Sequence, residues 1–348
     1  MSTALGQTSA LTISGLQTKF HTPQGELTAV DGIDLTVPRG SIVGLVGESG
    51  CGKSVTALSV LGLVPAGGQV TAGEICFQGR DLRRLSEKER RKLRGDRLAM
   101  IFQDPMTSLN PVYPVGRQVA EVLRLHRGMD RKSAKAKTID LFRQVGIPDP
   151  AARYDAYPRE LSGGLRQRVM IAMAMACEPE LLLADEPTTA LDVTIQAQIL
   201  SLMGDLRREH GTAILLITHN LGVVAQLCDL VYVMYAGQIV EAAETFALFR
   251  EAKHPYTQGL RKAIPALEGG QETLYTIRGT VPDLRCPPPG CRFCPRCDRA
   301  TEACAQSVPS LRDVGGGHFV PTKWTAASGS PHRKPEKTSV PTALQRNF

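Results

Sequence analysis

The segment from Gly47 to Ser54 has the residue types and spacing of a loop that holds phosphate groups. It runs Gly-Glu-Ser-Gly-Cys-Gly-Lys-Ser and fits the pattern G-x-x-x-x-G-K-[ST]. Glycines let backbone N–H groups converge on phosphate oxygens, and the helix that follows adds the positive end of its dipole. Lys53 is expected to reach the β- and γ-phosphates, and the Ser54 hydroxyl to coordinate Mg²⁺. The predicted contacts with magnesium-ATP are Gly47, Glu48, Ser49, Gly50, Cys51, Gly52, Lys53, Ser54 and Val55.

Two adjacent carboxylates, Asp185 and Glu186, are the next candidates for chemistry. They directly follow the apolar run Leu181 to Ala184, which predicts a buried strand. Parallel sheets bind ligands at the carboxyl ends of their strands. Asp185 is suited to hold Mg²⁺, directly or through water, and Glu186 to polarise an attacking water as a general base. The alternative is that both acids only cap the next helix, and the phosphate loop in the same chain favours catalysis.

A Ser-Gly-Gly sequence at Ser162 to Gly164 opens a predicted helix. Ser162 suits the N-cap position, and the amides of Gly163 and Gly164 lie at the helix start, where anions bind. An ordinary N-cap without a ligand is the alternative interpretation.

The elements that must position these residues alternate between strand and helix, which predicts an α/β fold with a parallel sheet and helices on both faces. Residues 11–46 predict several shorter strands, and residues 103–158 predict a mostly helical insert. The expected strands of the sheet are Ser41 to Val46, Leu98 to Phe102, Leu181 to Ala184, Ala213 to Ile217 and Leu230 to Tyr235. The expected helices are Lys53 to Val64, Gly164 to Ala176, Thr194 to Glu209 and Leu221 to Leu227.

Composition limits the class of protein. The chain has 348 residues, of which 42% are hydrophobic and 22% charged, as in a globular protein with a large core. No apolar run approaches the roughly 18 residues that span a bilayer. Met1 to Ala10 lacks the basic start and apolar segment of a signal peptide, so a reducing cytosol is expected. The net charge of +7 is spread along the chain and mixed with acids, which favours a solvated surface over a nucleic-acid site.

The Ser-Gly-Gly sequence and its surroundings resemble the ATP-binding-cassette (ABC) family. Its signature is Leu-Ser-Gly-Gly followed by a Gln-Arg pair, as in Leu161 to Arg168 here. Other family motifs occur in family order over about residues 11 to 245. They are Gln103 in Phe-Gln-Asp-Pro, Asp185-Glu186-Pro187, Ala190-Leu191-Asp192 and His219 in Thr-His-Asn.

The resemblance implies a nucleotide-sandwich dimer. Two ATPase domains pack head to tail, so the phosphate loop of one faces Ser162, Gly163, Gly164 and Asp192 of the other. Gln103 would sense Mg²⁺ and water, and His219 would contact the γ-phosphate and help to hold the water of Glu186. Phe20 lies where the family stacks an aromatic ring on adenine, although a core phenylalanine is the alternative.

The fold that the resemblance implies is that of an ABC-type P-loop NTPase. It has a mixed or parallel sheet core, an antiparallel β subdomain, a helical subdomain and an irregular, cysteine-containing C-terminal extension. The expected boundaries are 11–104 and 161–245 for the two parts of the core, 105–160 for the helical subdomain, 246–325 for the extension and 326–348 for a disordered tail.

The extension resembles that of ATPases serving oligopeptide and dipeptide importers. The similarity lies in His254 to Leu260 and in the cysteines of Gly290 to Cys304. Nickel importers use close relatives, so another solute is an alternative, and a non-transport role on nucleic acid is a less favoured one.

Five cysteines crowd into the extension. Cys291-x2-Cys294-x2-Cys297-x6-Cys304 is close to the spacing of an iron–sulfur site. In the subfamily, Cys291, Cys297 and Cys304 have counterparts, while Thr322 replaces the usual fourth ligand, so Cys294 or Cys286 would have to substitute. A [4Fe-4S] cluster is favoured, with Zn²⁺ or a metal-free state as alternatives.

The resemblance also implies partners. They are a second ATPase subunit, related or identical, two transmembrane permease subunits and an extracytoplasmic substrate-binding protein, with no nucleic acid. A coupling helix of the permease would dock near Gln103. The chain would lie peripherally on the cytoplasmic face of the inner membrane.

Overall fold

The computed structural model describes residues 9–189, 191–263 and 276–321. The predicted tail, 326–348, and Thr322 lie outside the described residues.

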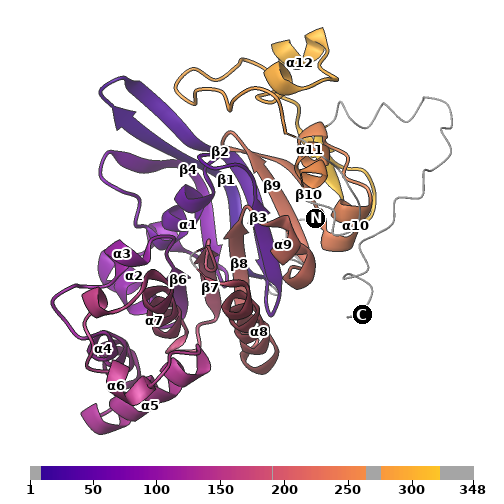
Figure 1. Ribbon diagram of the computed structural model, residues 1–348. Coiled ribbons are helices and arrows are strands. Elements are labelled where there is room, and N and C mark those ends of the chain that lie inside the picture. The colour runs from indigo at the N-terminus through magenta and orange to yellow at the C-terminus, as the bar shows by residue number, and fades with distance from the viewer. Residues whose placement is uncertain (1–8, 190, 264–275, 322–348) are drawn as a thin grey trace.

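An eight-stranded sheet forms the centre of the molecule (Figure 1), with the strand order β11-β12-β10-β9-β3-β8-β7-β6. Strands β9, β3, β8, β7 and β6 are parallel neighbours, and β10 joins β9 antiparallel. The expected parallel strands are therefore confirmed within a mixed sheet. The strands of this sheet are β3 (Ile42–Val46), β6 (Leu98–Ile101), β7 (Leu181–Asp185), β8 (Ala213–Thr218), β9 (Leu230–Tyr235), β10 (Gln238–Glu244), β11 (Leu311–Asp313) and β12 (Phe319–Pro321).

A second sheet is antiparallel and has the order β2-β1-β4-β5. Its strands are β1 (Ser9–Thr22), β2 (Gly25–Pro38), β4 (Gly68–Phe77) and β5 (Arg80–Asp81). Apolar residues of this sheet, such as Ile13 and Leu35, share one core with Leu45 and Leu183 of the large sheet and Val60 of helix α1 (Lys53–Leu61). One face of the large sheet is thus covered by a sheet and a helix. Helices therefore lie on both faces, as expected, and on this side α1 shares the face with antiparallel strands that bury their apolar side there.

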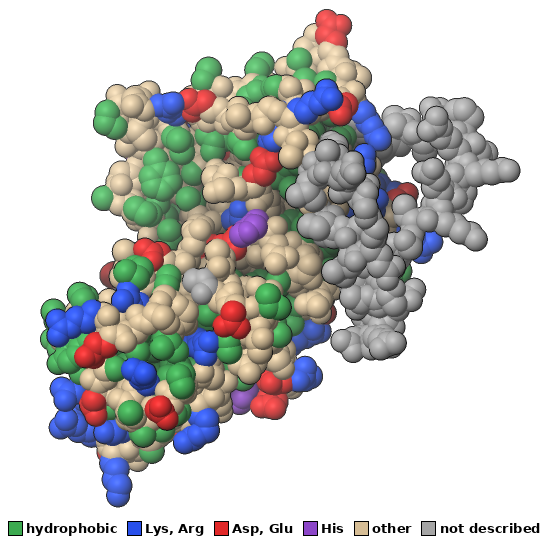
Figure 2. Space-filling model, in the orientation of Figure 1, with side chains coloured by type: hydrophobic (Ala, Val, Ile, Leu, Met, Phe, Trp, Pro, Cys, Tyr) green, Lys and Arg blue, Asp and Glu red, His purple; other side chains and the backbone are tan. Residues whose placement is uncertain are grey.

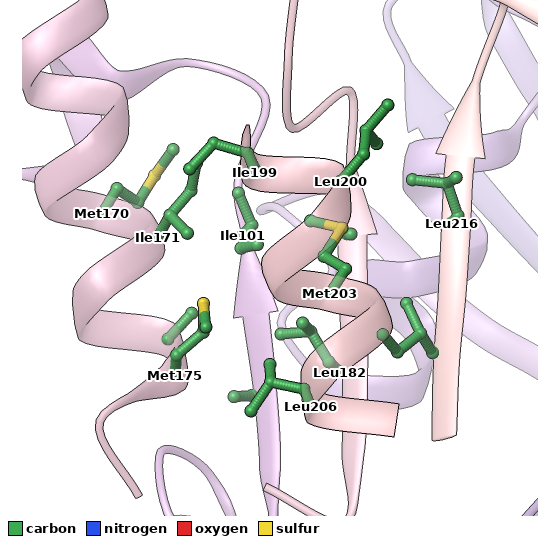
Figure 3. Packing of buried hydrophobic residues seen from close by; sticks show 14 of the residues in the cluster. Ile101, Met170, Ile171, Met175, Leu182, Ile199, Leu200, Met203, Leu206 and Leu216 are labelled. Atoms are coloured by element: carbon green, nitrogen blue, oxygen red, sulfur yellow. The ribbon is translucent and has the colours of Figure 1, made fainter. Parts of the chain in front are cut away.

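The other face of the large sheet is covered by helices, as expected. Figure 3 shows side chains of α7 (Gly163–Met175) and α8 (Val193–His210) pointing toward strand residues Ile101, Leu182 and Leu216. These residues belong to one buried cluster, in which Leu182 and Leu216 have no exposed surface. Helix α9 (Leu221–Leu227) completes this layer.

The helical insert lies at one end of the molecule (Figure 1). Its helices pack on α7, which places them beside the signature sequence and the end of β6. Its helices are α3 (Pro105–Ser108), α4 (Val115–Arg127), α5 (Arg131–Gln144) and α6 (Pro150–Arg153), and the chain returns through a 3-10 turn at Pro158–Glu160. Between β5 and β6 the chain forms a 3-10 turn at Leu82–Arg84 and helix α2 (Glu87–Leu93).

The C-terminal extension has short elements between irregular segments. It contains α10 (Thr245–Arg250), α11 (Pro255–Lys262), a 3-10 turn at Cys294–Arg296 and α12 (Glu302–Gln306). Strands β11 and β12 add to the large sheet through the pair Ala242–Phe319. Short strands with irregular patterns give little local signal, so only pairing with β10 reveals them. None of the helices in the described ranges is long and apolar enough to cross a membrane.

Candidate active site

Four neighbouring strands bring the predicted site residues to one edge of the sheet. β3, β8, β7 and β6 are parallel, so their carboxyl ends meet. The phosphate loop follows β3, Asp185 ends β7, His219 follows β8 and Gln103 lies two residues beyond β6. The sheet therefore brings together residues that lie far apart in the sequence. Gly47 and His219, for example, are separated by 172 positions.

The phosphate loop is shaped by glycines that leave no room for a side chain. A Cβ atom on Gly47 would lie 2.1 Å from the carbonyl oxygen of Met234, and one on Gly52 would lie 2.3 Å from that of Ala29. Gly52 also has a φ of 106°, a region that favours glycine. Tertiary contacts with two other strands therefore require these glycines.

Lys53 lies beneath this loop. It is buried, and its Nζ atom donates to the carbonyl oxygens of Gly47 at 2.7 Å and Glu48 at 2.9 Å. These bonds hold the ammonium at the centre of the loop, where it would meet phosphate oxygens. Burial raises the pKa of the neighbouring Cys51 thiol, although the charge of Lys53 opposes that shift. The Cys51 side chain is therefore a neutral thiol that packs inside the loop.

Asp185 and Ser54 form a site suited to Mg²⁺. Asp185 is buried, and burial raises its pKa, an effect that its hydrogen bond with Ser54 opposes. Its Oδ1 atom has no hydrogen-bond partner among the described residues. A buried, unpartnered carboxylate oxygen beside a hydroxyl is an expensive arrangement unless a cation binds there. The two residues therefore fit the metal that the sequence predicts.

Glu186 is held by its contacts with His219 and Thr189. Its Oε1 lies 2.7 Å from His219 Nδ1, and it accepts a bond from the His219 backbone N–H at 3.1 Å. Its Oε2 accepts from the Thr189 hydroxyl at 2.9 Å. The side chain of Glu186 is 10% exposed, whereas that of His219 is 64% exposed. Glu186 also has a φ of 49°, which a non-glycine residue adopts at a cost, as often happens at functional sites.

Gln103 and Phe20 occupy positions that leave them accessible. Gln103 is exposed at the carboxyl edge, immediately before Asp104, which caps α3. Phe20 is half-buried in β1, opposite Leu27 and Gly68. The ring contacts the Gly68 backbone position closely, since a Cβ there would lie 2.5 Å from it. Both the stacking and the core interpretation of Phe20 stay predictions.

The signature sequence is not joined to the phosphate loop. Ser162 caps α7 by accepting from the Leu165 N–H at 3.3 Å, and both Ser162 and Gly163 are exposed. Asp192 caps α8 in the same way through Ile195 N–H, at 3.0 Å. Within the described ranges, no hydrogen bond or ion pair connects these caps to residues 47–54. The helix starts of α7 and α8 are thus capped by their own side chains and, within the described ranges, are not bonded to the chain's own loop.

The sequence comparisons match both parts of the chain. The family model "ABC transporter" matches residues 30–189, and "Oligopeptide/dipeptide transporter, C-terminal region" matches residues 240–304. The dipeptide transport ATP-binding protein DppD of Escherichia coli (strain K12) is 50% identical over 307 residues, which cover 88% of this chain and 94% of that protein. This chain belongs to the ABC transporter ATPases.

Further similarities agree with this family. The oligopeptide transport ATP-binding protein OppD of Haemophilus influenzae is 50% identical over 309 residues, covering 89% of this chain and 95% of that protein. Among solved structures, the dimeric bacterial ABC transporter cassette MJ0796 superposes with a TM-score of 0.62 at 25% identity, covering 68% of this chain and 98% of that one. The ABC ATPase fold of this chain and its ATP-hydrolysing class follow from these matches.

Sequence reasoning missed two residues of this ABC ATPase that reach the phosphate loop from the extension. The Tyr256 hydroxyl accepts from the Glu48 backbone N–H at 2.8 Å. Arg296 forms a two-point pair with the Glu48 carboxylate, at 2.7 and 3.1 Å. No local sequence pattern predicts these contacts, because Arg296 lies 248 positions from Glu48.

The expected metal ligands of the extension are not placed as a metal site. Within the described ranges no three His, Cys, Asp or Glu side chains could hold a metal ion together. The Cys304 sulfur bonds to the Thr301 hydroxyl at 3.2 Å, and Cys286 is exposed. Burial raises the pKa of Cys291 and Cys297. As placed, Cys286, Cys291, Cys294, Cys297 and Cys304 do not fit a cluster or Zn²⁺.

Proposed function

We propose that this chain is the ATP-hydrolysing subunit of an ABC importer for dipeptides or oligopeptides. The observation that carries the proposal is the match of residues 240–304 to the C-terminal region of oligopeptide and dipeptide transporters. Most of this region lies beyond the sheet core and packs on it, and the matched family model is described by its peptide solutes. The names of the relatives DppD and OppD point to the same solute class.

ATP binding is assigned to the phosphate loop. The phosphates would lie at the start of α1, where Gly52 occupies the N-cap without a side-chain cap and the helix dipole favours negative charge. Lys53 then exchanges its bonds with loop carbonyls for bonds with phosphate oxygens. Ser54 and Asp185 would hold Mg²⁺, which neutralises charge on the β- and γ-phosphates. Phe20 is proposed to stack on the adenine ring.

Hydrolysis is assigned to Glu186 with His219 and Gln103. Glu186 accepts a proton from the attacking water, and general-base action of this kind contributes about a hundred-fold to ten-thousand-fold. His219 Nδ1, at 2.7 Å from the carboxylate, orients it. Gln103 stands at the same sheet edge beside the helical insert, and can report the state of the site to that insert.

A second ATPase subunit is proposed to complete each site. Ser162, Gly163 and Asp192, which are exposed, and Gly164, which is half-buried, would contact the nucleotide held by the partner's phosphate loop. The partner is a related subunit or a second copy. Both would sit beneath two permease subunits on the cytoplasmic face of the membrane, with an extracytoplasmic binding protein delivering the solute.

Nucleic acid is not a proposed partner. Figure 2 shows Lys and Arg side chains on the helical insert interspersed with Asp and Glu. Ion pairs such as Lys135–Asp155 and Arg143–Asp140 belong to this mixture. A duplex-binding surface would instead carry a continuous basic stripe.

A [4Fe-4S] cluster in the extension, with Zn²⁺ as the alternative, rests on cysteine spacing and on the subfamily resemblance alone. The placed side chains do not support it. Iron, sulfide and zinc analysis of protein purified without oxygen tests it, and a protein free of all three would remove the cluster from the proposal.

The experiment for transport is reconstitution of the complete complex in lipid. We expect ATPase activity to rise when the binding protein is loaded with a dipeptide or oligopeptide. Stimulation by nickel-loaded or other solute-loaded binding protein, with none by peptide, would assign the chain to that solute instead. Strongly salt-dependent duplex binding without membrane association would overturn the transport role.

A further inference from the structure

Glu48 occupies a position of the phosphate loop at which the motif allows any residue. Within the described residues, it is the one such position whose side chain pairs with the extension. Each of its polar groups has a partner. Its backbone N–H donates to Tyr256 Oη at 2.8 Å, and its carbonyl oxygen accepts from Lys53 Nζ at 2.9 Å. Its carboxylate takes two bonds from the Arg296 guanidinium. The residue is therefore held from the extension on one side and tied to the phosphate-binding lysine on the other.

Arg296 is itself anchored firmly. Its side chain is only 5% exposed, while that of Glu48 is 27% exposed. Its Nε donates to the carbonyl oxygen of Arg278 at 2.8 Å, and its Nη1 lies 3.3 Å from Tyr235 Oη. Two-point arginine–carboxylate pairs fix direction as well as distance. The guanidinium thus sets the orientation of the Glu48 side chain.

The aromatic rings around this pair form a rigid support. Tyr235 ends β9, next to the Met234 carbonyl against which Gly47 packs. Its ring lies 4.7 Å from that of Tyr256 and 5.2 Å from that of Phe293, measured between centroids. Tyr256 has no exposed surface, and Phe293 is 3% exposed. These contacts join strand β9, helix α11 and the cysteine segment behind the loop.

We propose that Arg296 and Tyr256 of the extension are positioning residues for nucleotide binding, acting through Glu48 to hold the phosphate loop in its binding shape. A loop that is already ordered loses less conformational freedom when the phosphates bind. The extension thereby contributes to the ATP site of its own subunit. This role rests on nucleotide binding at the loop and is independent of which solute is transported.

The test measures the Kd for magnesium-ADP, which is not consumed, on the full chain by calorimetry. We expect Arg296→Gln and Glu48→Gln each to raise the Kd about ten-fold, the effect of losing one charge-assisted pair. The Kd of the double variant should also be about ten-fold above that of the parent, because Arg296 acts only through Glu48. Arg299→Ala is the matched control, since Arg299 is an exposed arginine of the same segment, and it should leave the Kd unchanged.

Tyr256→Phe is the second probe, because it keeps the ring and removes only the hydroxyl that accepts from Glu48. It should raise the Kd several-fold while the thermal unfolding midpoint stays near that of the parent. Variants that bind as tightly as the parent, or a double variant whose two effects multiply to about a hundred-fold, would overturn the positioning role. Failure of the unaltered chain to bind magnesium-ADP would instead refute the nucleotide site itself.

Discussion

At the residue scale, the arrangement of Glu186 decides what the site can do. Asp185 and Glu186 are adjacent in sequence, yet their surroundings differ. Asp185 is buried next to Ser54 with one unpartnered oxygen, whereas Glu186 contacts exposed His219 and a threonine hydroxyl. The first environment suits a cation, and the second suits a base that reaches solvent water.

Replacing Glu186 with glutamine tests whether Glu186 is the base of the site. Glu186→Gln retains the volume and one acceptor oxygen for the His219 N–H, but removes the base. We expect steady-state hydrolysis to fall by about a hundred-fold or more, with ATP affinity retained and a closed dimer trapped. Phosphate release and nucleotide binding measure the two effects. Normal turnover by this variant would remove Glu186 from the catalytic role.

At the element scale, the strands and helices that carry the site depend on the core beneath them. Leu182 of β7 has no exposed surface and lies three residues before Asp185. It packs in the cluster between the sheet and helices α7 and α8 (Figure 3).

Leu182→Ala should lower the free energy of unfolding by about 3 kcal/mol, because it leaves a cavity in this cluster. Urea unfolding followed by circular dichroism measures the change. Leu125→Ala is the control, since Leu125 in α4 is 75% exposed. Equal stability of the two variants would contradict the described packing.

Helix α11 brings a pH-dependent contribution to stability. His254 caps this helix by accepting from the Tyr256 N–H at 3.2 Å, and Glu241 and the Phe293 ring lie beside it. Burial lowers the pKa of His254 to about 4, although the charge of Glu241 opposes that shift. The unfolded chain, with a pKa of about 6.5, therefore takes up the proton first. This stability is present above about pH 6.5 and is lost as the pH falls toward 4.

When the pH is lowered from 7.5 to 5, we expect protonation of His254 to reduce the free energy of unfolding by about 2 kcal/mol. His254→Asn keeps a capping side chain and removes the titration. Urea unfolding at both pH values should show a smaller difference for the variant. The same pH dependence in both proteins would assign the effect to other groups.

At the scale of the whole molecule, one chain contains two half-sites that do not meet. The phosphate loop and the carboxylates share one sheet edge, while Ser162 and Gly163 are exposed at the start of α7. This separation supports a requirement for a second subunit.

Gly163→Asp separates stability from assembly. A Cβ at Gly163 meets nothing within 4 Å, and an acidic residue in the first turn favours a helix, so the chain should fold at least as stably. The new charge would repel the phosphates of the partner's ATP, and we expect ATPase activity of the assembled complex to fall at least about ten-fold. Gly163→Ala is the uncharged control. Unchanged activity for Gly163→Asp would contradict the composite site.

The sequence by itself determined the residues that lie close together along the chain. The phosphate loop, the Asp185–Glu186 pair and the cap at Ser162 depend on local spacing, and strands such as Leu230–Tyr235 follow from local apolar patterns. These features need only a few neighbouring positions, so periodicity and turn chemistry reveal them.

Only the tertiary structure decided which distant residues meet. It placed an antiparallel sheet beside α1 on one sheet face and joined β12 to β10, and in the part of the chain that is described it gave the cysteines no metal-binding arrangement. It also brought Arg296 to Glu48 across 248 positions. The physical reason is that such contacts follow from the packing of whole elements against one another, and their partners leave no periodic trace in the local sequence.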